Sequence, residues 1–167
     1  MTNKEIKIAY EEYASLEELQ PQDRALAEAA IDAVSLSYAP YSHFNVGAAV
    51  RFEDGEIIKG ANQENAAYPS GQCAERTALF YASASRPDMA ITSIAIAAGQ
   101  NGNLIASPVT PCGACRQVMA QYQTKGGLPM SVLLVGSEKV WKFEKVDDLL
   151  PFIFDSILSV SINSKSL

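Results

Sequence analysis

Two short cysteine motifs constrain how this chain can fold. The first is Cys73-Ala74-Glu75, in "GQCAERTAL", and the second runs from Pro111 to Cys115, in "TPCGACRQVM". Each motif opens a stretch of helical composition. Free N–H groups and the helix dipole favour thiolate over thiol at a helix N-terminus. If the three sulfurs share one site, the fold has to bring the starts of these two helices together.

Periodicity and turn signals predict the remaining elements. Apolar residues at helical spacing predict a helix over residues 22–38, which Pro40 ends. Two apolar runs flank Asp54-Gly55 and predict a hairpin over residues 44–62. We expect further helices over 73–84 and 112–123, strands over 91–99, 130–136 and 140–146, and a short helix or turn from residue 147.

The order of these elements is typical of an α/β fold. Helix, hairpin, helix, strand, helix, strand and strand predict a three-layer α-β-α domain, with a mixed sheet of about five strands and helices on its faces. We expect an N-terminal extension over residues 1–21, the domain itself over 22–154 and a C-terminal tail over 155–167. Within the extension, "EIKIAYEEY" is a possible strand or frayed helix.

Composition limits the compartment and the partners. The 167 residues are 48% hydrophobic and 19% charged, as in one globular domain. No apolar run is long enough to cross a bilayer, and the chain starts without a secretory signal pattern, so we expect no membrane partner. An odd count of three cysteines disfavours a disulfide scaffold and indicates a reducing, cytoplasmic location. A net charge of −6 disfavours nucleic acid as the main partner.

The three cysteines are candidate ligands of a catalytic zinc ion. Cys112 and Cys115 are three residues apart, so both sulfurs can face one point from a single helical turn, and Cys73 can supply the third. Three protein ligands leave a fourth position open for water, as in catalytic zinc sites. The single histidine, His43, lies in a loop-like segment away from both motifs. Glu75 can reach the open position and move a proton there.

Charge balance gives the neighbouring arginines a role. Three thiolates outweigh the charge of Zn²⁺ by one, and ionised Glu75 adds another negative charge, so the cluster needs compensation. Arg76 follows Glu75, and Arg116 follows Cys115. We expect Arg76 to donate to one of the thiolates, although the sequence does not select the sulfur. The paired motifs match the zinc-deaminase signature, with cysteine in place of the first-motif histidine.

Longer segments around these motifs resemble the cytidine deaminase family, in its small, homotetrameric, three-cysteine form. They are "YAPYSHFNVGAA", "GANQENAAYPSGQCAERTAL", "SPVTPCGACRQVM" and "DDLLPFIF", in family order, and the likeness covers residues 22–154. The N-terminal extension is longer than the family usually has. The resemblance implies zinc-dependent hydrolysis of cytidine and deoxycytidine to uridine and deoxyuridine with release of ammonia, as in pyrimidine salvage.

The resemblance also implies a role for each site residue. Cys73, Cys112 and Cys115 would hold one Zn²⁺ per subunit, Glu75 would shuttle protons, and Arg76 and Gln117 would support the cysteines. Phe44 would pack against the pyrimidine, Asn62 and Glu64 would bind the ribose hydroxyls, and Ala74, Tyr68 and Phe154 complete the substrate-binding set. In a homotetramer, Phe154 would reach a neighbouring subunit's site, although Phe152 competes for that role.

Three alternatives stay open at this point. A deaminase of a cytosine-nucleoside antibiotic would share the zinc motifs, but "NQEN" together with Phe44 favours a plain ribose or deoxyribose. A nucleic-acid editing deaminase is disfavoured by the acidic charge and by the lack of a run of basic and aromatic residues. A non-catalytic zinc module would have no use for the Glu75 carboxylate at the open position.

Overall fold

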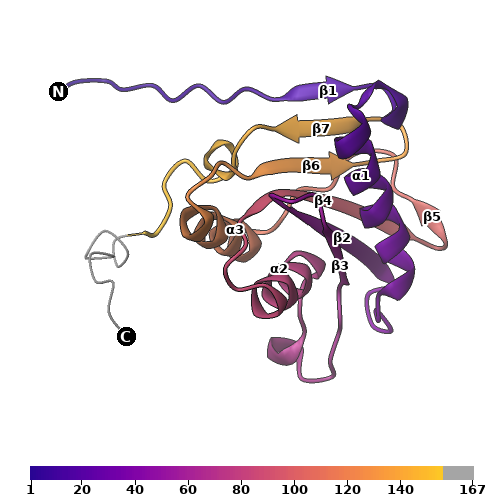
Figure 1. Ribbon diagram of the computed structural model, residues 1–167. Coiled ribbons are helices and arrows are strands. Elements are labelled where there is room, and N and C mark those ends of the chain that lie inside the picture. Colours follow the sequence, from indigo (N-terminus) through magenta and orange to yellow (C-terminus); the bar gives the residue numbers. More distant parts are fainter. Residues whose placement is uncertain (156–167) are drawn as a thin grey trace.

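One mixed β-sheet forms the middle layer of the protein in the computed structural model, which describes residues 1–155 (Figure 1). The strand order is β1-β7-β6-β4-β2-β3, with β5 paired to β4. Only the β4–β6 pair is parallel within this described part. The strands are β1 (Glu11–Tyr13), β2 (Phe44–Phe52), β3 (Ile57–Ala61), β4 (Ile91–Gln100), β5 (Asn103–Leu104), β6 (Ser131–Val135) and β7 (Val140–Phe143).

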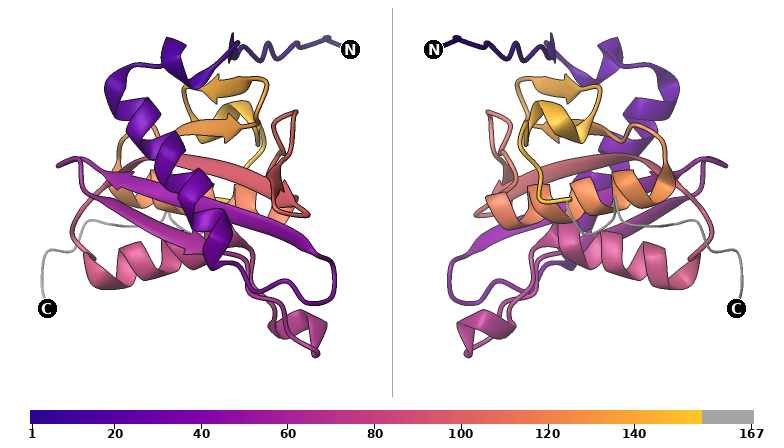
Figure 2. Two further views of the ribbon diagram at one scale, coloured as in Figure 1. Left: turned by 90° about the vertical axis from the view of Figure 1, so that its right-hand side faces the viewer. Right: turned by 90° about the vertical axis from the view of Figure 1, so that its left-hand side faces the viewer.

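Helices cover both faces of the sheet, as the sequence predicts. Helix α1 (Pro21–Ala33) lies on one face, and α2 (Ala74–Ser85) and α3 (Gly113–Gly126) lie together on the other (Figure 2). Among the described residues, no helix combines the length and the apolar character needed to span a membrane.

Alternating strand residues feed two separate cores. In β4, Ile94 and Ile96 join the core beneath α2 and α3, whereas Ala95 and Ala97 join the core beneath α1. Strand β6 follows the same alternation. Because both faces are buried, these strands have nearly continuous apolar sequences.

Two glycines set how closely the helices approach the sheet. A Cβ on Gly60 in β3 would lie 2.4 Å from the main-chain nitrogen of Ala78 in α2, and a Cβ on Gly47 in β2 would lie 2.2 Å from the carbonyl oxygen of Ala30 in α1. Main chain therefore packs directly on main chain at both places. The contact at Gly60 fixes α2, the helix that carries the first cysteine motif.

Most predicted elements are confirmed, with corrections at their ends. The hairpin turns at Gly55, whose φ of 92° requires the left-handed region. The first helix stops at Ala33 instead of residue 38 and continues as a 3₁₀ turn over Val34–Leu36. There Ser35 and Ser37 donate their hydroxyls to the main-chain carbonyls of residues 32 and 34, which competes with helix continuation.

The expected number of strands was too low by two. Strand β5 has two residues and β1 has three, so neither is long enough to show a two-residue repeat. Strand β1 comes from the N-terminal extension and pairs with β7. The segment from residue 147 contains a 3₁₀ turn, Val146–Asp148, and residues 156–167 of the expected tail lie outside the described part. The domain boundaries at 22 and 154 stay predictions.

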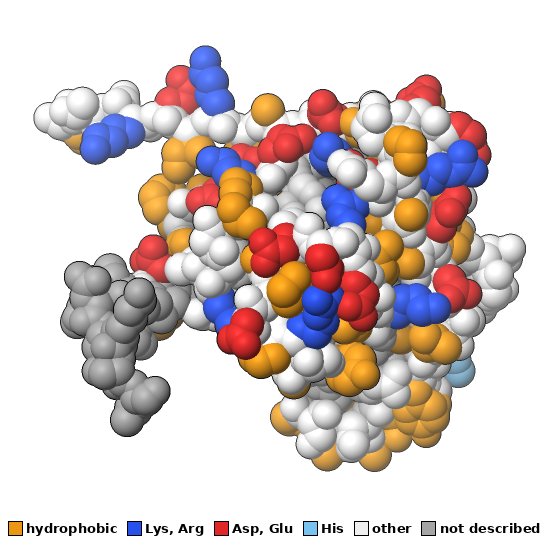
Figure 3. Space-filling view, viewed as in Figure 1, with side chains coloured by type: hydrophobic (Ala, Val, Ile, Leu, Met, Phe, Trp, Pro, Cys, Tyr) orange, Lys and Arg blue, Asp and Glu red, His pale blue; other side chains and the backbone are white. Residues whose placement is uncertain are grey.

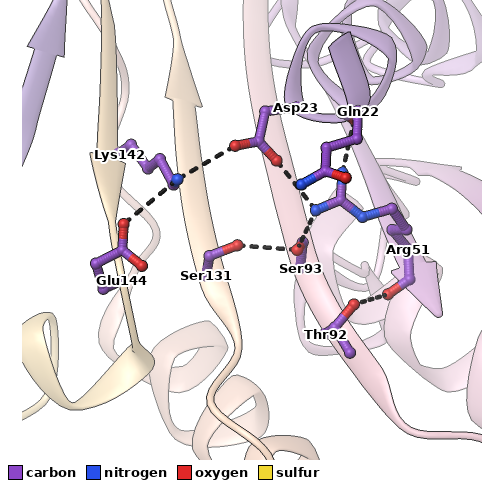
Figure 4. A network of polar contacts seen from close by, with 8 residues as sticks. All are labelled: Gln22, Asp23, Arg51, Thr92, Ser93, Ser131, Lys142 and Glu144. Carbon is purple, nitrogen blue, oxygen red and sulfur yellow. Dashed lines mark hydrogen bonds and ion pairs between the residues drawn. The ribbon is translucent and has the colours of Figure 1, made fainter. Parts of the chain in front are cut away.

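A buried polar network attaches α1 to four strands (Figure 4). Asp23 of α1 pairs with Arg51 of β2 at 3.0 Å and with Lys142 of β7 at 3.2 Å. Arg51 also donates to the hydroxyl of Ser93 in β4, which in turn accepts from Ser131 in β6. The Asp23 side chain is 5% exposed. The Asp23 carboxylate therefore lies between two cations, and the largely exposed Glu144 pairs with Lys142 as well, at 3.3 Å.

Replacing Asp23 with asparagine is expected to lower the free energy of unfolding by about 3 kcal/mol, because the largely buried Arg51 loses its compensating carboxylate and Lys142 keeps only the exposed Glu144. Asp32 on the same helix provides the matched control. Its side chain is 66% exposed and pairs with Lys59, so Asp32→Asn should cost less than about 1 kcal/mol. Denaturant titration measures both. Equal effects of the two substitutions would contradict a structural role for the network.

Candidate active site

The three cysteines meet where two helices begin. Cys73 is the N-cap of α2, Cys112 is the N-cap of α3, and Cys115 lies in the first turn of α3. Their Sγ atoms all lie within 4.8 Å of one another. The expected convergence of the two helix starts is therefore present.

Local backbone geometry leaves these sulfurs available for binding. Both N-cap residues are extended, and their carbonyl oxygens accept the first helical hydrogen bonds, from Thr77 and Arg116. Neither thiol caps its own helix. Each sulfur is thus presented at a positive helix end without a competing main-chain contact there.

The cluster fits a zinc ion. Three thiolates form a donor set that suits zinc, and Zn–S bonds of about 2.3 Å in a tetrahedral site place sulfurs ~3.8 Å apart, close to the observed grouping. Cys115 is buried and Cys112 is exposed, so the cluster is closed on the protein side and open on the other. That asymmetry is what a site with three protein ligands and one exchangeable position requires.

Arg76 supplies positive charge to this cluster. Its Nη2 donates to the Sγ of Cys73 at 3.4 Å, which identifies the sulfur that the sequence left open. Its Nε is buried and has no hydrogen-bond partner among the described residues. Hydrogen bonds from Cys115 and Arg76 lower the pKa of Cys73 to about 5, whereas the pKa of Cys115 is raised because its thiol is the donor. Cys73 therefore ionises before Cys115.

Glu75 lies beside the sulfurs in the first turn of α2. It is 6% exposed, and burial raises the pKa of its carboxyl group, with a further contribution from the Cys73 thiolate. A buried carboxylate with a raised pKa, next to a metal-binding cluster, is suited to accept and release a proton.

A pocket of about 700 Å³ opens in front of the cluster. It is bounded by segments from four parts of the chain, around residues 41–46, 62–76, 96 and 109–112. The structure brings together in it nearly all the residues that the sequence predicts for binding and chemistry. These are Phe44, Asn62, Glu64, Tyr68, Cys73, Ala74, Glu75, Arg76 and Cys112.

A short ladder of main-chain hydrogen bonds positions the segment that carries Asn62 and Glu64. Gln63 exchanges hydrogen bonds with Gln72, the residue before Cys73, and Tyr38 brackets the segment on its other side. The amide of Asn62 donates to the carbonyl of Phe44 and accepts from the N–H of Val46, at 2.9 and 2.8 Å. Asn62 therefore also holds the first residues of β2 in place.

Glu64 lines the same pocket as Asn62. Its carboxylate accepts from the Ser42 hydroxyl and from the N–H groups of Tyr41 and Ser42, and these bonds, the Ser42 hydroxyl first, lower its pKa. The carboxylate is thus ionised at neutral pH and keeps room for a further donor. Tyr68 also lines the pocket, and its ring lies edge-on to that of Tyr41, with the ring centroids 6.2 Å apart.

Gln117 and Phe154 lie together outside this pocket. The Gln117 side chain donates to the Phe154 carbonyl and accepts from the Phe154 N–H, at 2.9 and 3.1 Å. Arg116 binds the carbonyls of Pro111 and Leu149. The Phe152 and Phe154 side chains are largely exposed. A role for Gln117 at the cysteines, and for either phenylalanine at a neighbouring site, stays a prediction.

Sequence reasoning missed several residues of the pocket. Tyr41 and Ser42 hold Glu64, and Val109 and Thr110 line the wall beside Cys112. A signal existed for the second pair, because a residue before proline, here Thr110, is restricted to extended conformations and leads directly into the metal-binding turn. No local pattern indicates that Ser42 meets Glu64 across 22 residues.

Fold and site together define a zinc-binding α/β domain of the catalytic type, with three protein ligands and a carboxylate in place beside them. Residues 20–127 match the sequence profile of the "Cytidine and deoxycytidylate deaminase zinc-binding region". The chain belongs to this family.

Individual relatives agree with the family assignment. A cytidine deaminase of Halalkalibacterium halodurans is 52% identical over 97 residues, which are 58% of this chain and 68% of that protein. A crystal structure of cytidine deaminase from Burkholderia pseudomallei, 44% identical, covers 78% of this chain and 97% of its own, with a TM-score of 0.64. A Mycobacterium tuberculosis cytidine deaminase structure, 30% identical, gives 0.62 over 78% of this chain and 95% of its own.

Proposed function

We propose that the protein hydrolyses cytidine and deoxycytidine to uridine and deoxyuridine with release of ammonia. The observation that carries the proposal is the buried Glu75 carboxylate beside the three-sulfur cluster, in a pocket that also contains Phe44 and Glu64. Relatives named cytidine deaminase support it, since the chain matches their structures over nearly their whole length. The antibiotic and editing alternatives have no comparable support.

Cys73, Cys112 and Cys115 would hold the zinc ion. A zinc ion held by three thiolates lowers the pKa of a water in its open position to near 7. Arg76 moderates the donation of the Cys73 sulfur by hydrogen bonding to it, which keeps the site a useful Lewis acid.

Glu75 would carry the protons of the reaction. Its carboxylate accepts a proton from the attacking water and passes it to the ring nitrogen beside the amino-bearing carbon. That carbon gains the water oxygen and becomes tetrahedral, carrying both a hydroxyl and the amino group. Glu75 then takes the hydroxyl proton and delivers it to the amino group, so the bond from carbon to the exocyclic nitrogen breaks, ammonia leaves and the carbonyl of uridine forms. Burial suits Glu75 to this task because it brings the carboxyl pKa closer to neutrality.

The remaining pocket residues would hold the nucleoside. The Phe44 ring offers an apolar face for the pyrimidine. Ala74, the first residue of α2, lines the same pocket. Glu64, ionised and already fixed by Ser42, accepts from a ribose hydroxyl, and Asn62 adds an amide next to it. Tyr68, an exposed residue of the pocket wall, would contact the nucleoside from the side.

We further propose that four copies assemble and complete one another's sites, in the cytoplasm. The exposed side chains of Phe152 and Phe154 support shared sites, because they are available to a neighbouring copy and Gln117 holds the main chain of Phe154 in place. Three unpaired cysteines support a reducing compartment.

Loss of cytidine absorbance in the ultraviolet, followed with and without a chelator, tests the proposed activity. We expect turnover of cytidine and deoxycytidine that stops when zinc is removed and returns when zinc is restored. A zinc-loaded protein that leaves both nucleosides unchanged would contradict the proposal.

Replacing Glu64 with glutamine is expected to raise KM for cytidine at least about tenfold with little change in kcat, because a hydrogen bond to a charged group contributes roughly 1.5–3 kcal/mol to binding. Steady-state kinetics measure the two constants. Free cytosine, which has no ribose, is the matched control substrate, and the substitution should not affect its slower turnover. A fall confined to kcat would assign Glu64 to the chemistry instead.

A further inference from the structure

Residues 1–10 form an N-terminal arm, an extended segment that leaves the sheet and is exposed along its whole length. It runs from β1 past the end of β7 and projects from the body of the protein (Figures 1 and 3). Ile6, Ile8 and Tyr10 are 53%, 51% and 51% exposed. The family match starts at residue 20, so the arm lies outside the shared domain.

The root of the arm is firmly held. The Tyr10 ring stacks on Phe143 at 5.3 Å and contacts Trp141 at 5.4 Å. The Glu12 carboxylate accepts from Trp141 Nε1 at 2.6 Å and from Lys139 at 3.5 Å. These contacts orient the arm, because alternate residues of an extended chain point the same way. The even-numbered residues of the arm therefore point to the same side of the sheet as Trp141, which Tyr10 and Glu12 contact.

The outer edge of β1 is open. Strand β1 is the last in the sheet order and pairs on one side only, with β7. An open edge with apolar residues beside it is a template for another strand. An isolated extended segment also carries an entropic cost that only further contacts offset.

The arm is complementary to itself when two copies run antiparallel. With Ile8 opposite its own copy, Ile6 faces Tyr10 and Lys4 faces Glu12, so one face pairs apolar with apolar and cation with anion. On the other face Glu5 lies opposite Glu11, and Lys7, opposite Ala9 and diagonal to that Glu11, partly compensates the two carboxylates. This arrangement gives Ile6, Ile8 and Tyr10 apolar partners, whereas Ala9 faces Lys7.

Neighbouring registers fit less well. Centring on Lys7 places two lysines opposite each other, and centring on Ala9 places Ile6 opposite the Glu12 carboxylate that Trp141 holds. We propose that residues 4–12 pair antiparallel with the same segment of a second copy, centred on Ile8, and join two sheets through a two-fold interface. The globular domains of the two copies then lie on opposite sides of the paired arms, one at each end of the two-stranded ribbon that the arms form.

Three single-cysteine variants test the register. Ile8→Cys, Lys7→Cys and Ala9→Cys all lie at exposed positions, so none should disturb the fold. Only the residue on the two-fold axis meets its own copy, whereas residues one step away lie ~8 Å from theirs, beyond disulfide reach. The zinc-loaded variants are oxidised mildly, and the unmutated chain gives the background from the native cysteines.

We expect Ile8→Cys to form a linked dimer, twice the 18.0 kDa chain mass on denaturing gels, at least about tenfold faster than the other two variants. Equal rates for all three, or no link above background, would overturn the proposal, and a fastest link at residue 7 or 9 would overturn the register. The readout does not involve nucleosides, so it is independent of the proposed activity.

Amide hydrogen exchange at two protein concentrations provides a second measurement. Protection of residues 4–9 should rise with concentration and disappear in Ile8→Lys, which places two ammonium groups opposite each other. Protection that does not depend on concentration would mean that the arm packs on its own chain. Protection only with added foreign protein would mean a different partner. Either result would contradict pairing between copies.

Discussion

Replacing Glu75 with glutamine is expected to leave zinc bound and to lower kcat for cytidine by about 10²–10⁴-fold, the usual contribution of a positioned acid–base group. Glutamine preserves the volume of this buried side chain, so the fold should survive. It cannot accept the proton of the attacking water. The loss should therefore appear in kcat rather than in the affinity for nucleoside.

Two measurements separate this outcome from trivial ones. Elemental analysis should give the same zinc content for Glu75→Gln as for the unmutated chain, and Glu28→Gln, at an exposed position on α1, should leave both rate and zinc unchanged. Turnover within a few-fold of normal would exclude Glu75 as the proton carrier. Loss of zinc would instead make Glu75 part of the metal-binding set.

Replacing Cys112 with alanine is expected to abolish stable zinc binding, from about one ion per chain to near zero, and turnover with it. Cys112 is the informative ligand because its side chain is exposed, whereas Cys115 is buried and its removal would also leave a cavity. Two remaining thiolates, Cys73 and Cys115, hold the metal too weakly for a catalytic site.

Gly113→Ala is the matched control for Cys112→Ala, since a Cβ at Gly113 meets nothing within 4 Å. It adds a methyl group one residue away and should retain zinc. Zinc content by elemental analysis and the melting temperature with and without chelator measure both variants. Chelator should lower the melting temperature of the control and leave that of Cys112→Ala nearly unchanged. Stoichiometric zinc in Cys112→Ala would reject this ligand.

The catalytic centre could be predicted from sequence because its parts are local. Cys112 and Cys115 share one helical turn, and Cys73 and Glu75 lie two residues apart, so spacing indicates which side chains act together within each motif. The meeting of the two motifs was expected from the zinc-deaminase signature that they form as a pair. The hairpin at Gly55 is predictable for the same reason, since a two-residue turn signal specifies it.

What the sequence could not supply depends on contacts between distant segments. Asp23 is an ordinary first-turn carboxylate of a helix until folding places Arg51 and Lys142 around it. Ser42 is likewise unremarkable until Glu64 arrives beside it. For residues 5–13 the sequence left strand and frayed helix open, and a strand forms only over Glu11–Tyr13, because its stability comes from Tyr10 and Glu12 meeting the residues of β7.

The grip of Gln117 on Phe154 involves only the main chain of Phe154. Every amino acid except proline offers the same N–H and carbonyl, so these two hydrogen bonds do not depend on which side chain residue 154 carries. The position of the C-terminal segment is therefore independent of the side chains that it carries. Substitutions at residues 152 and 154 can change the exposed side chains there, while the main chain of the segment stays hydrogen-bonded to α3, the helix of the second cysteine motif.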